Sequence, residues 1–173
     1  MTWAVWLTGP PAAGKTTIAR AFLEALAAKG VRAVHLESDV LRRILTPDPT
    51  YEPAERDRFY REVAGLAGLL VSQGFPVVID ATAPRRQHRD HARSSIEKFL
   101  EVLVDAPEAV RRDRDPKGLY RLAGRGGAPH LPGATEAYEP PARPDLVLSG
   151  DRPVHEAVEG LLRLARSKGL LPS

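Results

Sequence analysis

The sequence predicts an α/β fold in which helices flank a five-stranded parallel sheet. Short apolar runs alternate with amphipathic helical patterns along the chain, which is typical of parallel strands joined by crossover helices. A glycine-rich turn between the first apolar run and the first helical pattern supports the same architecture. The chain has 173 residues, the length of one domain, so we expect a single domain over residues 1–173.

The elements follow in order from these patterns. Strands are expected at the apolar runs 2–8, 31–36, 75–80, 99–104 and 145–149. Helices are expected at residues 16–29, 40–45, 54–73, 86–98, 109–112 and 154–167. The first helix places Ile18, Phe22 and Leu26 on one face, and glycines at positions 30 and 74 end the first and third helices.

Residues 114–144 break the alternation. This stretch holds five glycines and six prolines with few apolar residues. Loops of this length are uncommon in compact domains and are usually either functional lids or disordered segments. We expect a mobile lid, with a flexible insertion as the alternative, because the stretch also carries the motifs described below.

Composition excludes several classes of protein. The absence of cysteine rules out disulfides, zinc-thiolate sites and cysteine nucleophiles. No stretch of 18 apolar residues exists that would cross a membrane, and the N-terminus does not resemble a signal peptide. A net charge of +3 does not require a nucleic-acid or membrane partner. We therefore expect a cytoplasmic protein with neither kind of partner.

The chain is also poor in thermolabile residues. It has no asparagine, two glutamines, one methionine and 16 prolines. Such a composition is typical of thermophile proteins, but GC-rich coding bias would favour the same residues. Both explanations remain open.

A phosphate-binding loop follows the first strand. The pattern G-x-x-x-x-G-K-[ST] is matched by Gly9, Pro10, Pro11, Ala12, Ala13, Gly14, Lys15 and Thr16, with Thr17 next. The backbone N–H groups of such a loop face an anion at the positive end of the following helix. The lysine would reach the β- and γ-phosphates, and the Thr16 hydroxyl would hold Mg²⁺. The chain is therefore expected to bind a nucleoside triphosphate, with ATP and Mg²⁺ as cofactors.

The acid that completes the metal site has two candidates. Asp39 follows the second strand, and Asp80 ends the third apolar run as in a Walker-B sequence. We take Asp39 as the first choice and Asp80 as the alternative. An aspartate at either place can also serve as a helix N-cap.

Further segments resemble one family of phosphate-binding-loop kinases, the adenylylsulfate kinases. Residues 115–120 read D-P-K-G-L-Y, a specific string of that family. Residues 37–42 (ESDVLR) resemble its D-G-D-x-x-R, and residues 51–56 (YEPAER) resemble its F-S-x-x-D-R. Residues 131–141 (LPGATEAYEPP) resemble its F-T-G-I followed by P-Y-E-x-P. The resemblance covers about residues 3–170.

The resemblance implies a reaction and a role for each matching position. These enzymes move the γ-phosphate of ATP to the 3′-hydroxyl of adenosine 5′-phosphosulfate (APS), which gives PAPS for sulfate assimilation. Asp39, Lys15 and Lys117 would be catalytic, and Asp39 would align the 3′-hydroxyl. The acceptor would be bound by Asp39, Arg42, Tyr51, Arg56, Phe59, Lys117 and Leu131, and Arg114 would join the ATP site. Family members are often dimers, so a homodimer is possible.

The pattern departs from the family on the acceptor side. The family's serine-containing segment after the third strand is replaced by residues 80–84 (DATAP), its asparagine aligns with Phe59, and its lid phenylalanine aligns with Leu131. A kinase with another acceptor and a non-catalytic ATP-binding module therefore remain alternatives. The retained Lys15 and Lys117 favour an enzyme.

Two basic stretches need a separate interpretation. Residues 85–89 begin a helix and residues 111–114 end another. Acids are interleaved with these arginines and no aromatic side chains accompany them, so we expect solvated faces and no nucleic-acid site. The five histidines show no metal-ligand spacing.

Overall fold

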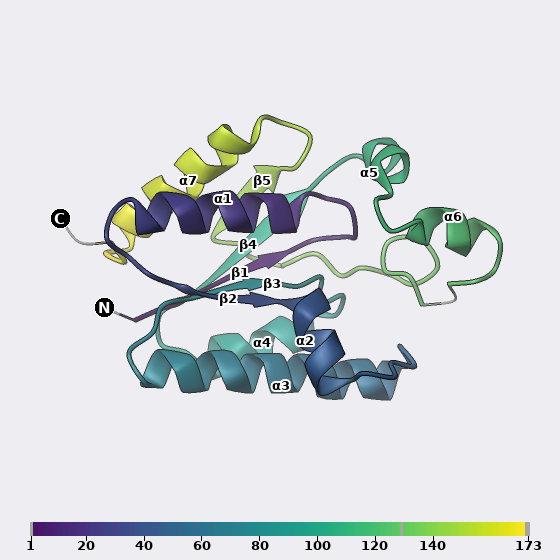
Figure 1. Cartoon of the computed structure of the whole chain (residues 1–173), viewed down its shortest axis with the longest axis horizontal. Helices are drawn as coiled ribbons and strands as arrows, with labels where there is room; N and C mark the ends of the chain where they lie inside the picture. The colour runs from purple at the N-terminus through teal and green to yellow at the C-terminus, as the bar shows by residue number, and fades with distance from the viewer. Residues whose placement is uncertain (1, 129, 172–173) are drawn as a thin grey trace.

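A parallel sheet forms the centre of the molecule (Figure 1). The computed structural model describes residues 2–128 and 130–171. Over these residues the strands are β1 Ala4–Thr8, β2 Val34–Glu37, β3 Val77–Asp80, β4 Phe99–Asp105 and β5 Leu146–Ser149. They pair in parallel in the order β2-β3-β1-β4-β5, which confirms the predicted fold class.

Helices cover both faces of this sheet (Figure 1). On one face lie α1 Lys15–Ala27 and α7 Val154–Ser167, and on the other lie α3 Pro53–Ser72 and α4 Arg86–Ser95. Three short helices gather at the edge where the strands end: α2 Ser38–Leu45, α5 Glu108–Arg114 and α6 Leu119–Gly124. This edge carries the candidate site.

Successive side chains of β1 point to opposite faces of the sheet, and the apolar ones are covered by helices on both faces. Val5 and Leu7 pack into the core under α1 and α7, whereas Ala4 and Trp6 pack into the core under α3 and α4. Strands that are buried on both sides need such a continuous apolar sequence. Because β1 and β3 are central neighbours and Leu7 pairs with Asp80, the ends of these two strands are held in fixed register.

The lid segment, our name for the predicted lid at residues 114–144, contains a helix that the sequence did not predict. Residues 119–124 form α6, which begins after Gly118 in a left-handed conformation. The Asp115 carboxylate accepts the backbone N–H groups of Tyr120 and Arg121, both at 3.1 Å, and so satisfies two free donors at the start of α6. A helix of six residues is too short for its apolar periodicity to be recognised in the sequence.

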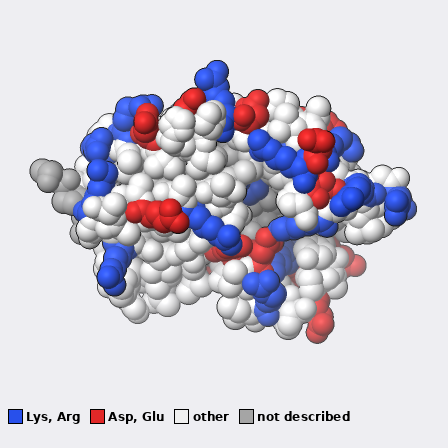
Figure 2. Space-filling model, turned by 45° about the horizontal axis from the view of Figure 1, so that its top comes forward, with Lys and Arg blue, Asp and Glu red and all other residues white. Residues whose placement is uncertain are grey.

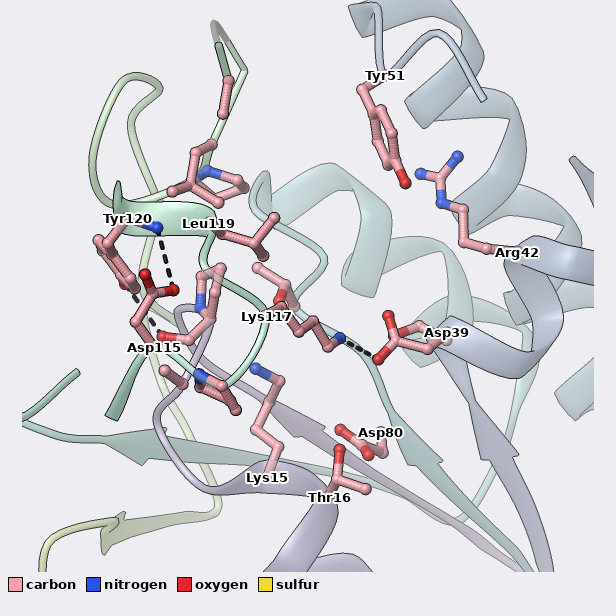
Figure 3. A pocket seen from close by; sticks show the side chains of 18 of the residues that line it. Lys15, Thr16, Asp39, Arg42, Tyr51, Asp80, Asp115, Lys117, Leu119 and Tyr120 are labelled. Atoms are coloured by element: carbon pink, nitrogen blue, oxygen red, sulfur yellow. Dashed lines mark hydrogen bonds and ion pairs between the residues drawn. The ribbon is translucent and has the colours of Figure 1, made fainter. Parts of the chain in front are cut away.

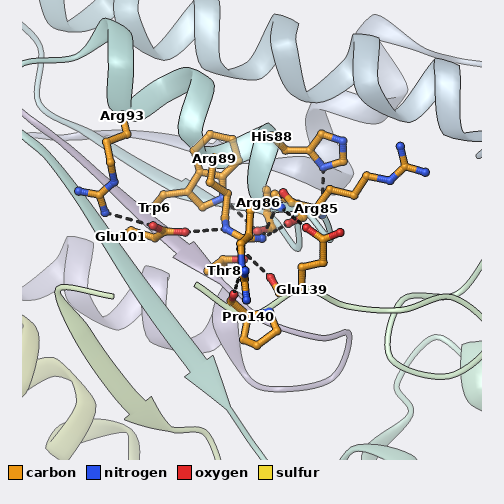
Figure 4. Close-up of polar contacts among 12 residues, drawn as sticks. Trp6, Thr8, Arg85, Arg86, His88, Arg89, Arg93, Glu101, Glu139 and Pro140 are labelled. Carbon is orange, nitrogen blue, oxygen red and sulfur yellow. Dashed lines mark hydrogen bonds and ion pairs between the residues drawn. The ribbon is translucent and has the colours of Figure 1, made fainter. Parts of the chain in front are cut away.

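The prediction of solvated basic faces is wrong for two arginines. Arg89 is fully buried, where its Nε donates to Glu101 at 2.6 Å and an Nη donates to the Glu139 carbonyl at 2.6 Å (Figure 4). Arg111 is also buried and donates to the carbonyl of Ala106. Both arginines therefore hold separate segments of the fold together.

In the described part of the chain no helix is long and apolar enough to span a membrane.

Candidate active site

A cavity of about 850 Å³ opens at the carboxyl ends of the strands. Figure 2 shows a hollow on one face of the molecule, with Lys, Arg, Asp and Glu side chains interleaved around it. Residues predicted from the sequence to bind nucleotide or acceptor line this cavity: Pro11, Ala12, Gly14, Lys15, Thr16, Thr17, Asp39, Arg42, Tyr51, Arg56, Asp80, Arg114, Lys117 and Leu131. The structure therefore brings together motifs that lie far apart in the sequence.

The phosphate-binding loop wraps the start of α1. Gly9 has φ 149°, and a Cβ there would collide with the carbonyl oxygen of Val104. Gly14 has φ 101° and is the N-cap residue of α1. Glycine at both places lets the backbone turn sharply enough to present its N–H groups at the helix N-terminus. This arrangement is suited to a polyphosphate.

Lys15 lies beneath this loop with its ammonium held by the chain. Its Nζ donates to the carbonyls of Gly9 and Pro10, each at 2.9 Å. Burial lowers the pKa of Lys15 to about 8, although the charge of Asp80 opposes the shift. The ammonium is therefore desolvated in advance, which strengthens its attraction to a bound phosphate.

Asp80 ends β3 beside Thr16 (Figure 3). Its side chain is almost completely buried, and burial raises its pKa, while Lys15 and the Thr16 hydroxyl pull the pKa back down. Within the described residues its Oδ2 has no hydrogen-bond partner, and neither has the Nε2 of His35 at 3.9 Å. A buried carboxylate oxygen without a partner is costly, so this atom is suited to a cation or its water.

Asp39 and Lys117 meet across the cavity (Figure 3). Asp39 lies in the first turn of α2 and is not its N-cap residue, which is Glu37. Lys117 comes from the lid segment, and its Nζ forms an ion pair with the Asp39 carboxylate. Asp39 remains about half exposed, at 47 %. The structure thus places Asp39 with a lid lysine, whereas Asp80 is the acid beside Thr16.

Arg42 forms part of one wall of the cavity, near Tyr51 (Figure 3). Its guanidinium pairs with Glu55 and stacks on the ring of Phe59 at 3.8 Å. Phe59 itself is fully buried and does not line the cavity, so it supports Arg42 from below rather than facing the acceptor directly. Tyr51 is exposed, with φ 60°, and its ring lies 5.2 Å from the Arg42 guanidinium.

Arg56 connects α3 to the lid. It is 5 % exposed, and its two Nη atoms donate to the Glu136 carboxylate at 2.6 Å and to the His130 carbonyl at 2.7 Å. Leu131, next to His130, is buried against the cavity. The predicted acceptor-binding arginines are therefore both paired with carboxylates of the chain itself.

Tyr120 is a structural residue of the site that sequence reasoning did not single out. Its hydroxyl accepts a hydrogen bond from Arg111 at 2.7 Å and donates to the carbonyl of Pro11 at 3.0 Å. The D-P-K-G-L-Y string thus starts α6, directs Lys117 into the cavity and ties α6 to the phosphate-binding loop. Thr82 also lines the cavity. Its position two residues after Asp80 is the sequence feature that could have indicated this.

A strand, a phosphate-binding loop and a helix, with an acid at the end of the neighbouring strand, define the class of P-loop kinases. A sequence model of the family "Adenylylsulphate kinase" matches residues 1–149. The chain belongs to this adenylylsulfate kinase family, which confirms the resemblance found in the sequence.

Relatives agree with this assignment. The chain is 42% identical to an adenylyl-sulfate kinase of Paraburkholderia xenovorans over 160 residues, which are 91% of this chain and 89% of that protein. It is 34% identical to the APS kinase of Mycobacterium tuberculosis, solved in complex with AMPPNP and APS, with a TM-score of 0.90 over 95% of this chain and 98% of the other. A hexameric APS kinase from Thiobacillus denitrificans is 25% identical with a TM-score of 0.74, over 99% of this chain and 30% of that chain.

Proposed function

We propose that this chain transfers the γ-phosphate of ATP to the 3′-hydroxyl of APS and so makes PAPS. The observation that carries the proposal is that one cavity joins two chemically distinct halves. Lys15, Thr16 and Asp80 lie on one side of it, and Asp39, Lys117 and two arginines lie on the other. The first half suits a triphosphate, and the second suits an acceptor with two strongly acidic groups.

ATP binds along the phosphate-binding loop. The N–H groups at the start of α1 take the phosphates, and Lys15 exchanges its contacts with the Gly9 and Pro10 carbonyls for the γ-phosphate. Arg114, whose Nη1 donates to the Gly150 carbonyl at 2.7 Å, lies at the edge of the same half. The acceptor therefore approaches from the opposite side.

The residues of this chain fit Mg²⁺ best at Thr16 and Asp80. Both offer oxygen, which Mg²⁺ prefers, and the Asp80 Oδ2 has no other partner among the described residues. Among the described residues, no three His, Cys, Asp or Glu side chains come together as a metal site. We therefore expect an ion here to be held mainly by phosphates and water. When bound, Mg²⁺ would neutralise charge on the transferring phosphate. This makes Asp80, the alternative from the sequence, our preferred metal residue.

The acceptor half positions the nucleophile. Asp39 accepts the proton of the 3′-hydroxyl, and Lys117 carries the positive charge next to it. Arg42 and Arg56 bind the phosphosulfate, and Tyr51 offers an aromatic face to the adenine. Leu131 and the lid around it exclude water, which would otherwise hydrolyse ATP.

Other aspects of the proposal follow from the relatives and the charge pattern. The Mycobacterium tuberculosis protein was solved with an ATP analogue and APS, which supports the same two ligands here. The hexameric relative is an oligomer of this family. A homodimer of this chain remains a prediction. A cytoplasmic location without a nucleic-acid partner also remains a prediction.

The test is ADP release by the purified protein with ATP and Mg²⁺, measured with and without APS. We expect APS to stimulate ADP release with equal formation of PAPS. The Lys15→Ala variant should lose about 10²-fold or more of the turnover, because the γ-phosphate loses its cation.

ATP binding without stimulation by APS would contradict the proposed acceptor. The chain would then be a kinase for another anionic nucleotide or sugar. Near wild-type turnover of Lys15→Ala would contradict the role of the loop lysine.

A further inference from the structure

The three cations assigned to the acceptor are each paired with a carboxylate of this chain. The pairs are Arg42 with Glu55, Arg56 with Glu136 and Lys117 with Asp39. An acidic acceptor must therefore compete with side chains of the protein for its own binding groups. The three pairs differ in how firmly their carboxylates are held elsewhere.

Glu55 is a fixed part of the cavity wall. Besides the contact with Arg42, its carboxylate accepts the backbone N–H groups of Thr50 at 2.7 Å and Tyr51 at 2.8 Å. Removing it from Arg42 would leave these two donors without their acceptor. Glu55 therefore stays in place when a ligand binds.

Glu136 is held far less firmly. Within the described residues its carboxylate accepts one hydrogen bond, from the Nη1 of Arg56 at 2.6 Å. The Nδ1 of His130 lies 3.7 Å from the same carboxylate. This carboxylate can leave Arg56 without breaking any other hydrogen bond of its own.

Glu136 also belongs to a unit that can move as a whole. Residues 131–136 form a tight turn in which the N–H of Gly133 donates to the Glu136 carbonyl at 2.7 Å, and the N–H of Glu136 donates to the Leu131 carbonyl at 3.0 Å. Arg56 is the group on α3 that holds this turn, through Glu136 and through the His130 carbonyl. The two contacts with one guanidinium form a latch between α3 and the lid.

We propose that Glu136 is a resident anion that occupies Arg56 in the free protein and is displaced by the acidic group of the acceptor. Arg56 is too deeply buried to remain unpaired, so one anion or the other must be present. Displacement removes one of the two contacts that hold the turn to α3, which loosens the turn, and the lid can then close over the nucleotides. An acceptor without a strong anion cannot displace Glu136, which makes this pair a determinant of selectivity.

The identity of the acceptor in this inference rests on the proposed function, but the latch itself does not. Its test compares the wild-type protein with Glu136→Gln, which keeps the size of the side chain and removes its charge. Glu62→Gln is the matched control, because Glu62 makes an exposed pair with Arg58 on α3, away from the cavity.

The first measurement is amide hydrogen exchange in residues 130–136 of the nucleotide-free protein. We expect faster exchange in Glu136→Gln than in wild type and Glu62→Gln. Inorganic sulfate, compared with chloride at equal ionic strength, should speed exchange of this turn in wild type but not in Glu136→Gln. Equal exchange in all three proteins, or no response of wild type to sulfate, would overturn the latch.

The second measurement is steady-state kinetics. We expect Glu136→Gln to lower the KM for APS about fivefold, because a competing anion has been removed, and to leave the KM for ATP unchanged. A raised KM for APS would show that Glu136 helps to hold the acceptor, and would overturn the inference. If wild type shows no APS-dependent ADP release, the proposed function fails, while the exchange experiment still decides whether the latch exists.

Discussion

At the scale of single residues, the site separates the tasks of two aspartates that the sequence could not tell apart. Asp80 is buried beside Thr16, and one of its oxygens has no partner in the described part of the chain, whereas Asp39 is half exposed and paired with Lys117. The first environment suits a metal, and the second suits a base near the acceptor. The sequence made Asp39 the first choice for the metal and Asp80 the alternative, because both residues follow expected strands and the sequence does not show which carboxylate is buried.

This difference predicts distinct kinetic defects. Asp39→Asn should lower kcat by about 10²- to 10⁴-fold with little change in ATP affinity, because proton acceptance is lost. Asp80→Asn should raise the Mg²⁺ concentration needed for half-maximal rate by roughly 10- to 100-fold. Steady-state rates over a Mg²⁺ titration measure both effects.

Asp90→Asn provides the control for this comparison, because Asp90 is exposed on α4 and does not line the cavity. An increased Mg²⁺ requirement in Asp39→Asn, with none in Asp80→Asn, would return the metal to Asp39.

Lys15 gives the molecule a predictable response to pH. Its pKa in the free protein is about 8, and a bound polyphosphate favours the charged ammonium and raises that pKa. Below pH 8 the lysine is already protonated, so ATP affinity should be flat there. Above pH 8 ATP must bind together with a proton, so the Kd should rise by up to about tenfold per unit.

Calorimetry at pH 9 in buffers of different ionisation enthalpy measures this linkage. We expect uptake of close to one proton on ATP binding by wild type. Lys15→Met should show none. Proton-independent binding by wild type at that pH would contradict the assigned pKa.

At the scale of elements, α6 explains what the D-P-K-G-L-Y string does. Asp115 starts the helix, Gly118 makes the turn, and Tyr120 anchors the helix to Pro11 and Arg111. The string was identified as functional because it matches a specific sequence of the family, but the match did not reveal the helix, which also depends on the distant contact between Tyr120 and Pro11. Local capping by Asp115 and the distant hydrogen bond to Pro11 together hold this element in place.

The tie between α6 and the phosphate-binding loop predicts a coupled defect in Tyr120→Phe. Arg111 would lose a buried acceptor and Pro11 would lose a donor, at a cost of about 1–3 kcal/mol in the free energy of unfolding. The KM for ATP should rise as well, because the loop loses its brace. Thermal unfolding and ATP kinetics measure the two effects.

Tyr138→Phe is the matched variant, since its hydroxyl bonds Thr8 at 2.9 Å and the residue does not line the cavity. It should be destabilised without a change in the KM for ATP. If both variants change that KM equally, the brace is not specific to Tyr120.

At the scale of the whole molecule, the sequence was sufficient for the architecture. The continuous apolar run of β1, the helical periodicity of α1 and the short motifs of the family are local signals, so the strands, most helices and the family could be predicted. The interior positions of Arg89 and Arg111 could not, because an arginine looks the same in sequence whether it is solvated or buried against a distant carboxylate. Arg89 joins Glu101 on β4 to the chain at Ala83 and Glu139, three segments that only the fold brings together (Figure 4).

Both ends of the lid are fastened to the body of the molecule. Arg114 holds the carbonyl of Gly150 at the outgoing end, while the N–H of Glu139 donates to the Pro84 carbonyl at the returning end. The segment between these fixed points can change in length and sequence, provided that Tyr120 and Tyr138 keep their hydrogen bonds to Pro11 and Thr8. Related proteins with this arrangement can keep the same phosphate-binding loop and acquire a new acceptor through substitutions in this segment and in the cavity wall that faces it.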